Sequence, residues 1–398
     1  NTYCLSYAYF TIFAPIYKIE IHMRPIQMVD LKQQYEHIKS DVDEAIHKVL
    51  DSCAFINGKP VQDFAQHLAA YSGSKHVIPC ANGTDALQIA LMALGLEPGD
   101  EVITPSFTYI ATTEVIALLR LKPVFVEVDP QTFCISPEAV EKAITPKTRA
   151  IVPVHLYGQA ANMEVLMQIA EKHNLHVVED NAQAIGCDYI FNSGVKKKAG
   201  TIGTIGCTSF FPSKNLGCYG DGGAIFTNDD ELAERLKMIA NHGQKVKYYH
   251  EIVGCNSRLD TLQAAILNVK LKKLGEYIAA RQKAAAYYNK AFANHPKVTT
   301  PFTAPYTDHV FHQYTLILNG VNRDGLNKYL TEHRVPSMIY YPVPAHRQKM
   351  FEAFGGAAYR LPQTDWLTER VISLPIHTEL DEEQLAFITQ KVLAYINN

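Results

Sequence analysis

The sequence predicts an α/β fold in which a large, mostly parallel sheet domain precedes a smaller α+β domain. Two observations support this prediction. Short apolar runs alternate with helical patterns from the middle of the first hundred residues onward, and prolines interrupt this alternation near residue 300. Nearly continuous apolar runs are typical of strands that are buried on both faces, and the helices between them suit right-handed crossovers. We therefore expect a large domain at residues 23–275 and a small one at residues 276–398.

The expected strands of the large domain are short β-rich segments. Five of them lie at residues 76–79, 101–104, 123–126, 150–154 and 175–178. Two more, at residues 208–211 and 224–227, flank a glycine-rich turn and predict a hairpin-like pair. An amphipathic helix is expected to begin near Asp229 and to stop at Gly243.

The smaller domain is expected to follow a boundary that is rich in proline. A helix is predicted from about Leu259 towards Ala293, and three prolines follow it between residues 296 and 305. The elements expected beyond them are a strand at residues 310–318, helices near Asp324 and Asp381, and a strand that ends at Tyr341. Asp381 and Gln384 have the spacing of a helix capping box.

Composition and charge argue against several classes of protein. The 398 residues include 37 lysines and arginines against 40 aspartates and glutamates, and the longest basic run is residues 196–198, so nucleic-acid binding is not expected. Long apolar stretches are absent from the sequence, so a membrane span is not expected. Eight cysteines without a C-x-x-C pair indicate reduced thiols and a cytoplasmic location. Residues 1–22 do not resemble a secretory signal, and we interpret them as an extension outside the fold; a natural hydrophobic arm is the alternative.

Residues that can carry chemistry follow four of the expected strands, at the edge where open α/β sheets bind ligands. The first group, residues 80–85, is a glycine-containing turn that opens a helix, and its free N–H groups can hold a phosphate. The alternative is that Thr84 or Asp85 is simply a helix N-cap. The second group, residues 104–109, can present the ring of Tyr109 to a planar ligand, although a lone tyrosine is more often part of a core.

The third and fourth groups add an acid and an amine. Asp180 follows a hydrophobic strand, where a carboxylate needs a cationic partner unless it is merely an N-cap. Lys214 lies among aromatic, serine, proline and glycine residues, unlike an ordinary solvated lysine, and a buried amine can attack a carbonyl. Together the four groups offer what pyridoxal phosphate requires: an amine for its aldehyde, a helix N-terminus for its phosphate, a stacking ring, and an acid for its pyridine nitrogen.

Four motifs resemble those of the DegT/DnrJ/EryC1/StrS sugar aminotransferase family. They are Gly83-Thr84-Asp85-Ala86-Leu87, Glu179-Asp180-x-Ala182-Gln183, Ser209-Phe210-x-x-x-Lys214 and Asn256-x-Arg258-Leu259-Asp260-x-x-Gln263-Ala264-Ala265. The likeness covers nearly everything after Met23. It implies the fold-type I architecture of aspartate aminotransferase, a homodimer with shared active sites, and pyridoxal 5′-phosphate as cofactor. It also implies transfer of an amino group from glutamate, which becomes 2-oxoglutarate, to a keto group on a nucleotide-linked sugar.

The resemblance implies roles for individual residues as well. Lys214 resembles the Schiff-base lysine and Asp180 the partner of the pyridine nitrogen, so both are expected to be catalytic. Gln183 resembles a donor to the ring hydroxyl, and Tyr109 the stacking residue. The other expected cofactor-binding residues are Gly83, Thr84 and Ser209, the last two as phosphate ligands, and Asn256 from the neighbouring subunit. The expected substrate-binding residues are Arg258, Tyr340 and Tyr341, and no metal is expected.

The segment 214–223 resembles family members that aminate the 3-keto position more than members that act at C4. The closest likeness is to members acting on UDP-linked 2-acetamido-3-oxo-glucuronic acid, followed by those acting on dTDP-3-keto-6-deoxyhexoses. Tyr340 stands where several of these members carry histidine, and the stretch between Asp180 and Lys214 is longer than usual. Both departures bear on substrate choice. The product is expected to enter a surface polysaccharide or a related glycoconjugate.

Other interpretations compete with this one. A C4 aminotransferase has the same chemistry, and a non-catalytic regulatory member of the same fold would not need the intact lysine, aspartate and glutamine set. A sugar 3-dehydratase of this fold carries histidine in place of Lys214. The glycines of residues 200–206 do not match the dinucleotide fingerprint of an oxidoreductase. His309 and His312 lie on an expected strand without zinc-ligand spacing, so we interpret them as structural.

Overall fold

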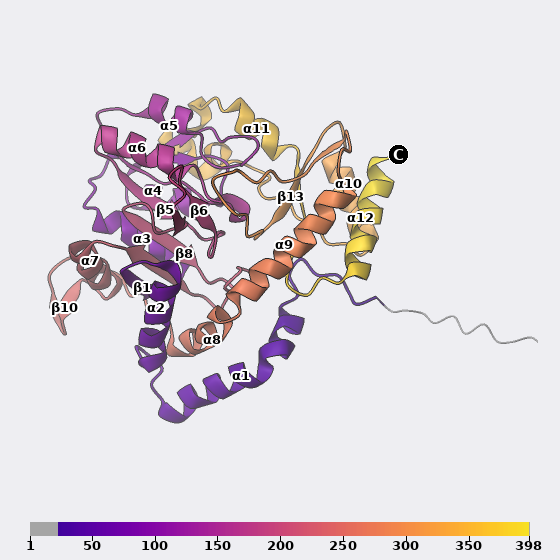
Figure 1. Cartoon of the computed structure of the whole chain (residues 1–398). Helices are drawn as coiled ribbons and strands as arrows, with labels where there is room; N and C mark the ends of the chain where they lie inside the picture. Colours follow the sequence, from indigo (N-terminus) through magenta and orange to yellow (C-terminus); the bar gives the residue numbers. More distant parts are fainter. Residues whose placement is uncertain (1–22, 398) are drawn as a thin grey trace, which may run out of the picture.

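The computed structural model describes residues 23–397, so our interpretation of residues 1–22 lies outside the described part. A seven-stranded sheet forms the centre of the larger part (Figure 1). Its strands are β1 (His76–Cys80), β2 (Glu101–Pro105), β3 (Lys122–Val126), β4 (Thr148–Ile151), β5 (His176–Asp180), β8 (Ile205–Ser209) and β9 (Gly223–Thr227), in the order β1-β9-β8-β5-β4-β2-β3. All neighbours from β8 to β3 pair in parallel, and β9 pairs antiparallel with β8 and β1. The predicted α/β fold with a mostly parallel sheet is confirmed.

Helices follow most of these strands. The α-helices are α1 (Leu31–Ser52), α2 (Lys59–Ser72), α3 (Gly83–Ala93), α4 (Ala111–Leu118), α5 (Pro137–Ala143), α6 (Met163–His173), α7 (Asp230–Ala240), α8 (Thr261–Leu271), α9 (Leu274–Ala291), α10 (Arg323–Glu332), α11 (Pro362–Thr368) and α12 (Glu382–Ile396). Short 3₁₀ turns are η1 (Leu156–Gly158), η2 (Ala345–Arg347), η3 (Lys349–Phe354) and η4 (Gly356–Ala358). Two small hairpins project from the large part: β6 (Asp188–Ile190) with β7 (Lys196–Lys198), and β10 (Gln244–Val246) with β11 (Tyr249–His250).

Both faces of the sheet are covered because the strands are apolar on both sides. Val102 and Val178 belong to one core together with side chains of α3, α4 and α7. Ile103 and Val177, each one position away, belong to another core with side chains of α2, α6 and α8. Successive side chains of a strand point to opposite faces, so this alternation places helices on both sides of the sheet.

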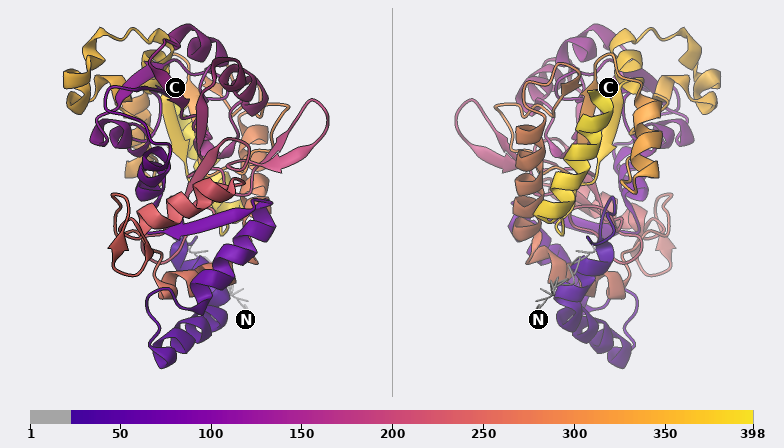
Figure 2. Two further views of the ribbon diagram at one scale, coloured as in Figure 1. Left: turned by 90° about the vertical axis from the view of Figure 1, so that its left-hand side faces the viewer. Right: turned by 90° about the vertical axis from the view of Figure 1, so that its right-hand side faces the viewer.

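The C-terminal part builds a core of its own around a three-stranded antiparallel sheet, seen beside α9 and α12 in Figure 2. Its strands are β12 (Val298–Thr299), β13 (Tyr314–Leu318) and β14 (Val371–Leu374). The capping box of Asp381 and Gln384 at the start of α12 is confirmed. Helix α9 contributes Ile278 to one of the two cores of the large sheet and Tyr288 to the C-terminal core, where Ile26 also packs. A domain boundary at residue 275 stays a prediction.

Three expected elements differ in the structure. The helix expected from Leu259 towards Ala293 is two helices, because the chain turns between α8 and α9. The expected strand at residues 310–318 begins only at Tyr314, since the N–H groups of Val310 and Gln313 bind the carbonyls of the η1 turn instead.

The prediction of a strand that ends at Tyr341 is wrong. In this segment Met338 forms a single bridge to Ser373, and prolines at residues 336, 342 and 344 remove the donors that a ladder needs. Strand β14 pairs with β13 in its place. Within residues 23–397, the helices include none with both the length and the apolar character required to cross a membrane.

Candidate active site

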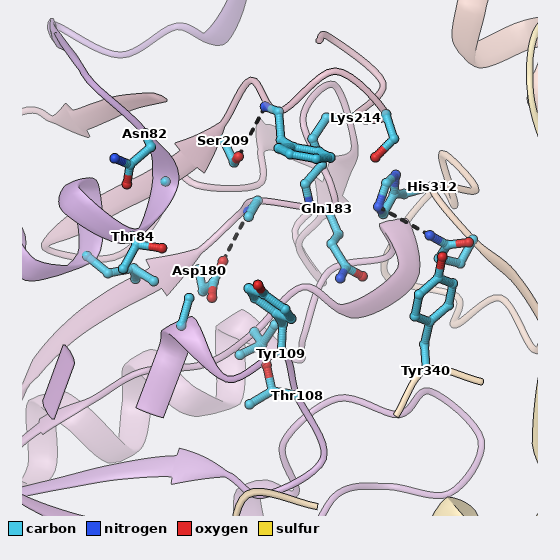
Figure 3. A pocket seen from close by; sticks show the side chains of 18 of the residues that line it. Asn82, Thr84, Thr108, Tyr109, Asp180, Gln183, Ser209, Lys214, His312 and Tyr340 are labelled. Atoms are coloured by element: carbon cyan, nitrogen blue, oxygen red, sulfur yellow. Dashed lines mark hydrogen bonds between the residues drawn. The ribbon is translucent and has the colours of Figure 1, made fainter. Parts of the chain in front are cut away.

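A cavity of about 660 Å³ lies at the carboxyl ends of β1, β2, β5 and β8. Segments that follow these four strands line it, and residues 312–313 and 340–341 complete its wall (Figure 3). The expected site residues that line it are Gly83, Thr84, Tyr109, Asp180, Gln183, Ser209, Lys214, Tyr340 and Tyr341. The fold therefore brings together four groups that are up to about 130 residues apart in the sequence, because parallel strands end at one edge.

Asp180 is the last residue of β5 and is 5% exposed. Its carboxylate accepts a hydrogen bond from Thr112 Oγ1 at 2.7 Å and another from the N–H of Ala182 at 3.1 Å. Both donors are neutral, so the expected cationic partner is not at ion-pair distance among the described residues. Turns rather than a helix follow Asp180, and the N-cap interpretation is therefore wrong.

Lys214 lies in the turn after β8, where its N–H donates to the carbonyl of Phe211. Its side chain is partly buried, and its amine makes no hydrogen bond or ion pair with the described residues. Burial lowers the pKa of this amine to about 8, although the nearby Asp180 carboxylate acts in the opposite direction. A lysine with such a pKa is partly unprotonated near neutral pH and can act as a nucleophile or a base.

The N-terminus of α3 forms the opposite wall of the cavity. Asn82 is the N-cap, and its Oδ1 accepts from the N–H of Asp85 at 2.8 Å, so the interpretation of Thr84 or Asp85 as the cap is wrong. The N–H groups of Gly83 and Thr84 meet no acceptor among the described residues. A Cβ at Gly83 would lie 2.6 Å from Cβ of Ser209, so only glycine allows the helix to begin this close to the end of β8. Free N–H groups and a serine hydroxyl here form a cradle for an anion.

Tyr109, Tyr341 and Gln183 form a polar and aromatic wall. Tyr109 is 57% exposed, so its interpretation as a core residue is wrong, and its ring centroid lies 6.0 Å from that of Tyr341. Gln183 donates through Nε2 to the hydroxyl of Tyr341 at 2.9 Å and accepts at Oε1 from the N–H of Tyr157 at 2.7 Å. These bonds fix the orientation of the Gln183 amide at the edge of the cavity.

Two expected site residues lie outside the cavity of this chain. Asn256 is exposed and forms a bridge with Asn241, and Arg258 donates to Asn241 Oδ1 at 3.5 Å. Their expected roles need a second copy of the chain and stay predictions.

The structure also adds residues that the sequence analysis missed. Thr112 on α4 binds the Asp180 carboxylate, and His312 and Gln313 line the cavity. His312 is 4% exposed, whereas the sequence predicts it to be a structural histidine on a strand. Its segment reaches the site through packing against the η1 turn, a contact for which the sequence carries no local signal.

The residues of this cavity fit pyridoxal phosphate. Lys214 supplies an unpartnered amine, Asp180 a carboxylate held by neutral donors, the start of α3 free N–H groups, and Tyr109 an exposed ring. These are the four groups that this cofactor requires of a protein.

Comparisons with known proteins agree with this geometry. The model of the DegT/DnrJ/EryC1/StrS aminotransferase family matches residues 36–393. A pleiotropic regulatory protein of Geobacillus stearothermophilus is 47% identical over 93% of this chain and 98% of its own. The UDP-2-acetamido-2-deoxy-3-oxo-D-glucuronate aminotransferase of Pseudomonas aeruginosa is 47% identical over 91% of this chain and 98% of its own. The X-ray structure of S. venezuelae DesV in complex with a ketimine intermediate has a TM-score of 0.89 and 41% identity, and the match covers 94% of this chain and 100% of DesV. The chain belongs to the DegT/DnrJ/EryC1/StrS aminotransferase family.

Proposed function

We propose that this protein is a pyridoxal-phosphate-dependent aminotransferase that moves an amino group from glutamate to the 3-keto position of a nucleotide-linked sugar. The observation that carries the proposal is the placement of the unpartnered Lys214 amine and the Asp180 carboxylate in one cavity. The P. aeruginosa relative, whose name describes a UDP-linked 3-oxo sugar as substrate, supports the substrate class.

Lys214 and Asp180 carry the chemistry in this proposal. The bound cofactor supplies an aldehyde for amino-group exchange and an electron sink for the carbon that loses its proton. The Lys214 amine would act as the base that removes the α-proton of glutamate and as the acid that returns a proton, and it would serve in the same two roles for the sugar. Asp180 would keep the pyridine nitrogen of the bound cofactor protonated, and Thr112 and the Ala182 N–H hold the carboxylate in a fixed position.

The other residues bind and orient the cofactor. The N–H groups of Gly83 and Thr84, with the hydroxyls of Thr84 and Ser209, hold its phosphate, since anions bind favourably at a helix N-terminus. Tyr109 would stack on the ring of the cofactor, and the Gln183 amide would donate to the ring hydroxyl.

We also propose a homodimer in which each cavity is completed by the other subunit. The cavity is incomplete in one chain because Tyr109 and Phe211, at 57% and 52% exposed, line it without cover. The β10–β11 hairpin next to the Asn256 loop exposes Tyr248 and Tyr249, which is typical of a surface covered in an assembly. Asn256 then reaches the phosphate and Arg258 the substrate of the neighbouring subunit.

Substrate contacts on the sugar side are assigned to Tyr340 and Tyr341, which line the cavity with Gln313. The 3-keto position, the glycoconjugate end product and a cytoplasmic location follow from the family resemblance and the relative's name, and they stay predictions. A C4 aminotransferase is the competing regiochemistry.

Absorbance spectroscopy and a coupled assay test the function together. The purified protein is expected to be yellow, to bleach with glutamate, and to lose both properties in Lys214→Ala. Turnover with 2-oxoglutarate is then measured against UDP-, dTDP- and GDP-linked 3-amino and 4-amino sugars. A protein that is colourless after incubation with the cofactor, or that turns over only 4-amino sugars, would contradict the proposal in its chemistry or its position.

A regulatory protein is the second candidate, because one relative carries that name. A regulator needs no free lysine amine in the cavity, whereas the amine and the acid are both in place here. A yellow protein that does not respond to glutamate would favour this candidate.

A further inference from the structure

His312 is a buried imidazole in the wall of the cavity, and the mechanism above does not use it. It is 4% exposed and lies in the same cavity as Lys214 and Tyr340. In Figure 3 it sits on the side of the cavity away from Asn82 and Thr84, with its Nε2 towards the Gln313 amide at 3.5 Å. Its Nδ1 is fully buried and has no hydrogen-bond partner among residues 23–397.

The backbone that carries His312 is held rigidly. Buried Arg281 donates through Nη1 to the carbonyls of Phe311 at 3.2 Å and of His312 itself at 3.3 Å. The next residue, Gln313, donates its N–H to the carbonyl of Tyr157 at 3.1 Å, and the N–H of Tyr157 binds Gln183. The backbone of His312 is therefore connected by hydrogen bonds to Gln183, a residue assigned to cofactor binding. The unpartnered Nδ1 of His312 belongs to a well-held segment and not to a loose loop.

A buried polar atom without a partner costs free energy, and in native proteins such atoms are rare and often have a functional reason. Burial lowers the pKa of His312 well below its ordinary value, and the positive charges of Lys214 and Arg281 act in the same direction. The imidazole is then neutral, with one donor and one acceptor nitrogen. A neutral imidazole pairs with a hydroxyl or an amide through either nitrogen, and it lacks the positive charge that would form an ion pair with a carboxylate.

We propose that His312 binds the sugar: its imidazole forms a hydrogen bond with a hydroxyl or acetamido group of the nucleotide-linked sugar when the reacting carbon lies beside Lys214. The inference rests on the proposed function, and it names a residue that distinguishes the nucleotide-linked sugar from glutamate. Glutamate carries two carboxylates and no hydroxyl, so it can use only the donor nitrogen of His312, whereas a sugar hydroxyl can use either nitrogen. The larger contribution of His312 is therefore expected in the sugar half of the reaction.

Two variants of His312 and one control test this assignment. His312→Phe keeps an aromatic ring and removes both nitrogens, whereas His312→Asn keeps a short donor and acceptor. His309→Phe is the matched control, because His309 is also 4% exposed and in the same segment, stacks on Phe311 at 3.9 Å, and does not line the cavity. Thermal melts of all three variants with bound cofactor report whether the fold is retained.

The two half-reactions are followed separately by the absorbance of the cofactor, one with glutamate and one with the 3-amino nucleotide sugar that the panel identifies. In His312→Phe, the sugar half-reaction is expected to slow by about threefold to tenfold, the loss typical of one neutral hydrogen bond, with a smaller loss in the glutamate half-reaction. His312→Asn is expected to recover part of the loss, and His309→Phe to affect neither half.

Calorimetry gives a readout that does not depend on turnover. The pyridoxamine form of the enzyme cannot react with an amino sugar, and His312→Phe is expected to weaken its binding of that sugar by the same factor. Equal losses in both half-reactions, or no loss in a folded His312→Phe, would overturn the inference while leaving the proposed function intact. A wild-type protein that does not respond to glutamate would contradict the proposed function and this inference with it.

Discussion

Glu179 and Asp180 are adjacent carboxylates at the end of β5, and the protein treats them in opposite ways. Glu179 is fully buried and accepts four hydrogen bonds, from His155 Nε2 at 2.8 Å and from the N–H groups of Gly200, Ile202 and Gly203 at 2.6–2.8 Å. Asp180 accepts two from the protein and lines the cavity. The Glu179 carboxylate is fully satisfied by hydrogen bonds within the protein, whereas the Asp180 carboxylate remains available to a ligand.

The difference between Glu179 and Asp180 explains the glycine-rich segment 200–206. Its N–H groups bind an anion, as glycine-rich loops do in nucleotide sites, but the anion is the protein's own Glu179. Burial alone would raise the pKa of Glu179, and the hydrogen bonds from His155 and the backbone hold it below its usual range. Glu179 therefore stabilises the loop behind the sheet edge, whereas Asp180 acts at the front.

The largest effect is expected from Asp180→Asn. The amide keeps the shape of the side chain but cannot hold a proton on the pyridine nitrogen, so kcat is expected to fall about a hundredfold or more. Thermal melts of the apoprotein are expected to change little, because both of its protein donors are neutral. Steady-state kinetics and calorimetry check this; an active Asp180→Asn enzyme would remove the distinction between the two carboxylates.

Glu179→Gln is expected to act on stability instead. The amide nitrogen would face backbone N–H donors, leaving buried groups unpaired at a cost of about 3 kcal/mol in the free energy of unfolding. Chemical denaturation of the apoprotein measures this loss. The rate per folded, cofactor-loaded molecule is expected to stay within a fewfold of the wild type, and a kinetic loss as large as that of Asp180→Asn would show that both carboxylates serve the chemistry.

A pair of glycine variants sharpens the structural half of the comparison. Gly200→Ala places a Cβ at a φ of +86° and 2.7 Å from Asn181 Nδ2, and about 2 kcal/mol of destabilisation is expected. Gly194→Ala is the matched control, because it has a φ of +83° and nothing within 4 Å, so about 1 kcal/mol of backbone strain is expected alone. Equal losses of unfolding free energy in the two variants would mean that close packing at residue 200 contributes nothing.

The smallest effect is a shift in pH dependence. Because the unprotonated amine of Lys214 is the nucleophile and its pKa is about 8, the rate at which the apoprotein takes up pyridoxal phosphate is expected to rise as the pH increases through 8. The negative charge of Asp180 favours the protonated amine and raises this pKa, so Asp180→Asn is expected to move the rise to lower pH. Stopped-flow absorbance measures it. The charge of Glu179 is surrounded by its own hydrogen-bond donors. Glu179→Gln is therefore expected to leave the pH of the rise unchanged.

Sequence patterns found the strands of the large sheet and the residues that directly follow them because both signals are local. The apolar runs at residues 101–104 and 175–178 overlap strands β2 and β5, and Tyr109 and Asp180, which follow these runs, line the cavity. The same reasoning failed at β14, at the break between α8 and α9, and at residues 310–313, where pairing with a distant segment decides the conformation.

The sequence by itself determined which segments become buried strands, and it placed an amine and an acid just beyond two of them, since hydrophobic periodicity acts over a few residues. The tertiary structure decided which of two neighbouring carboxylates stays open and that His312 reaches the cavity. Those outcomes depend on donors and packing partners such as His155, Gly200 and Arg281, which lie tens of residues away and meet their targets only after the chain has folded.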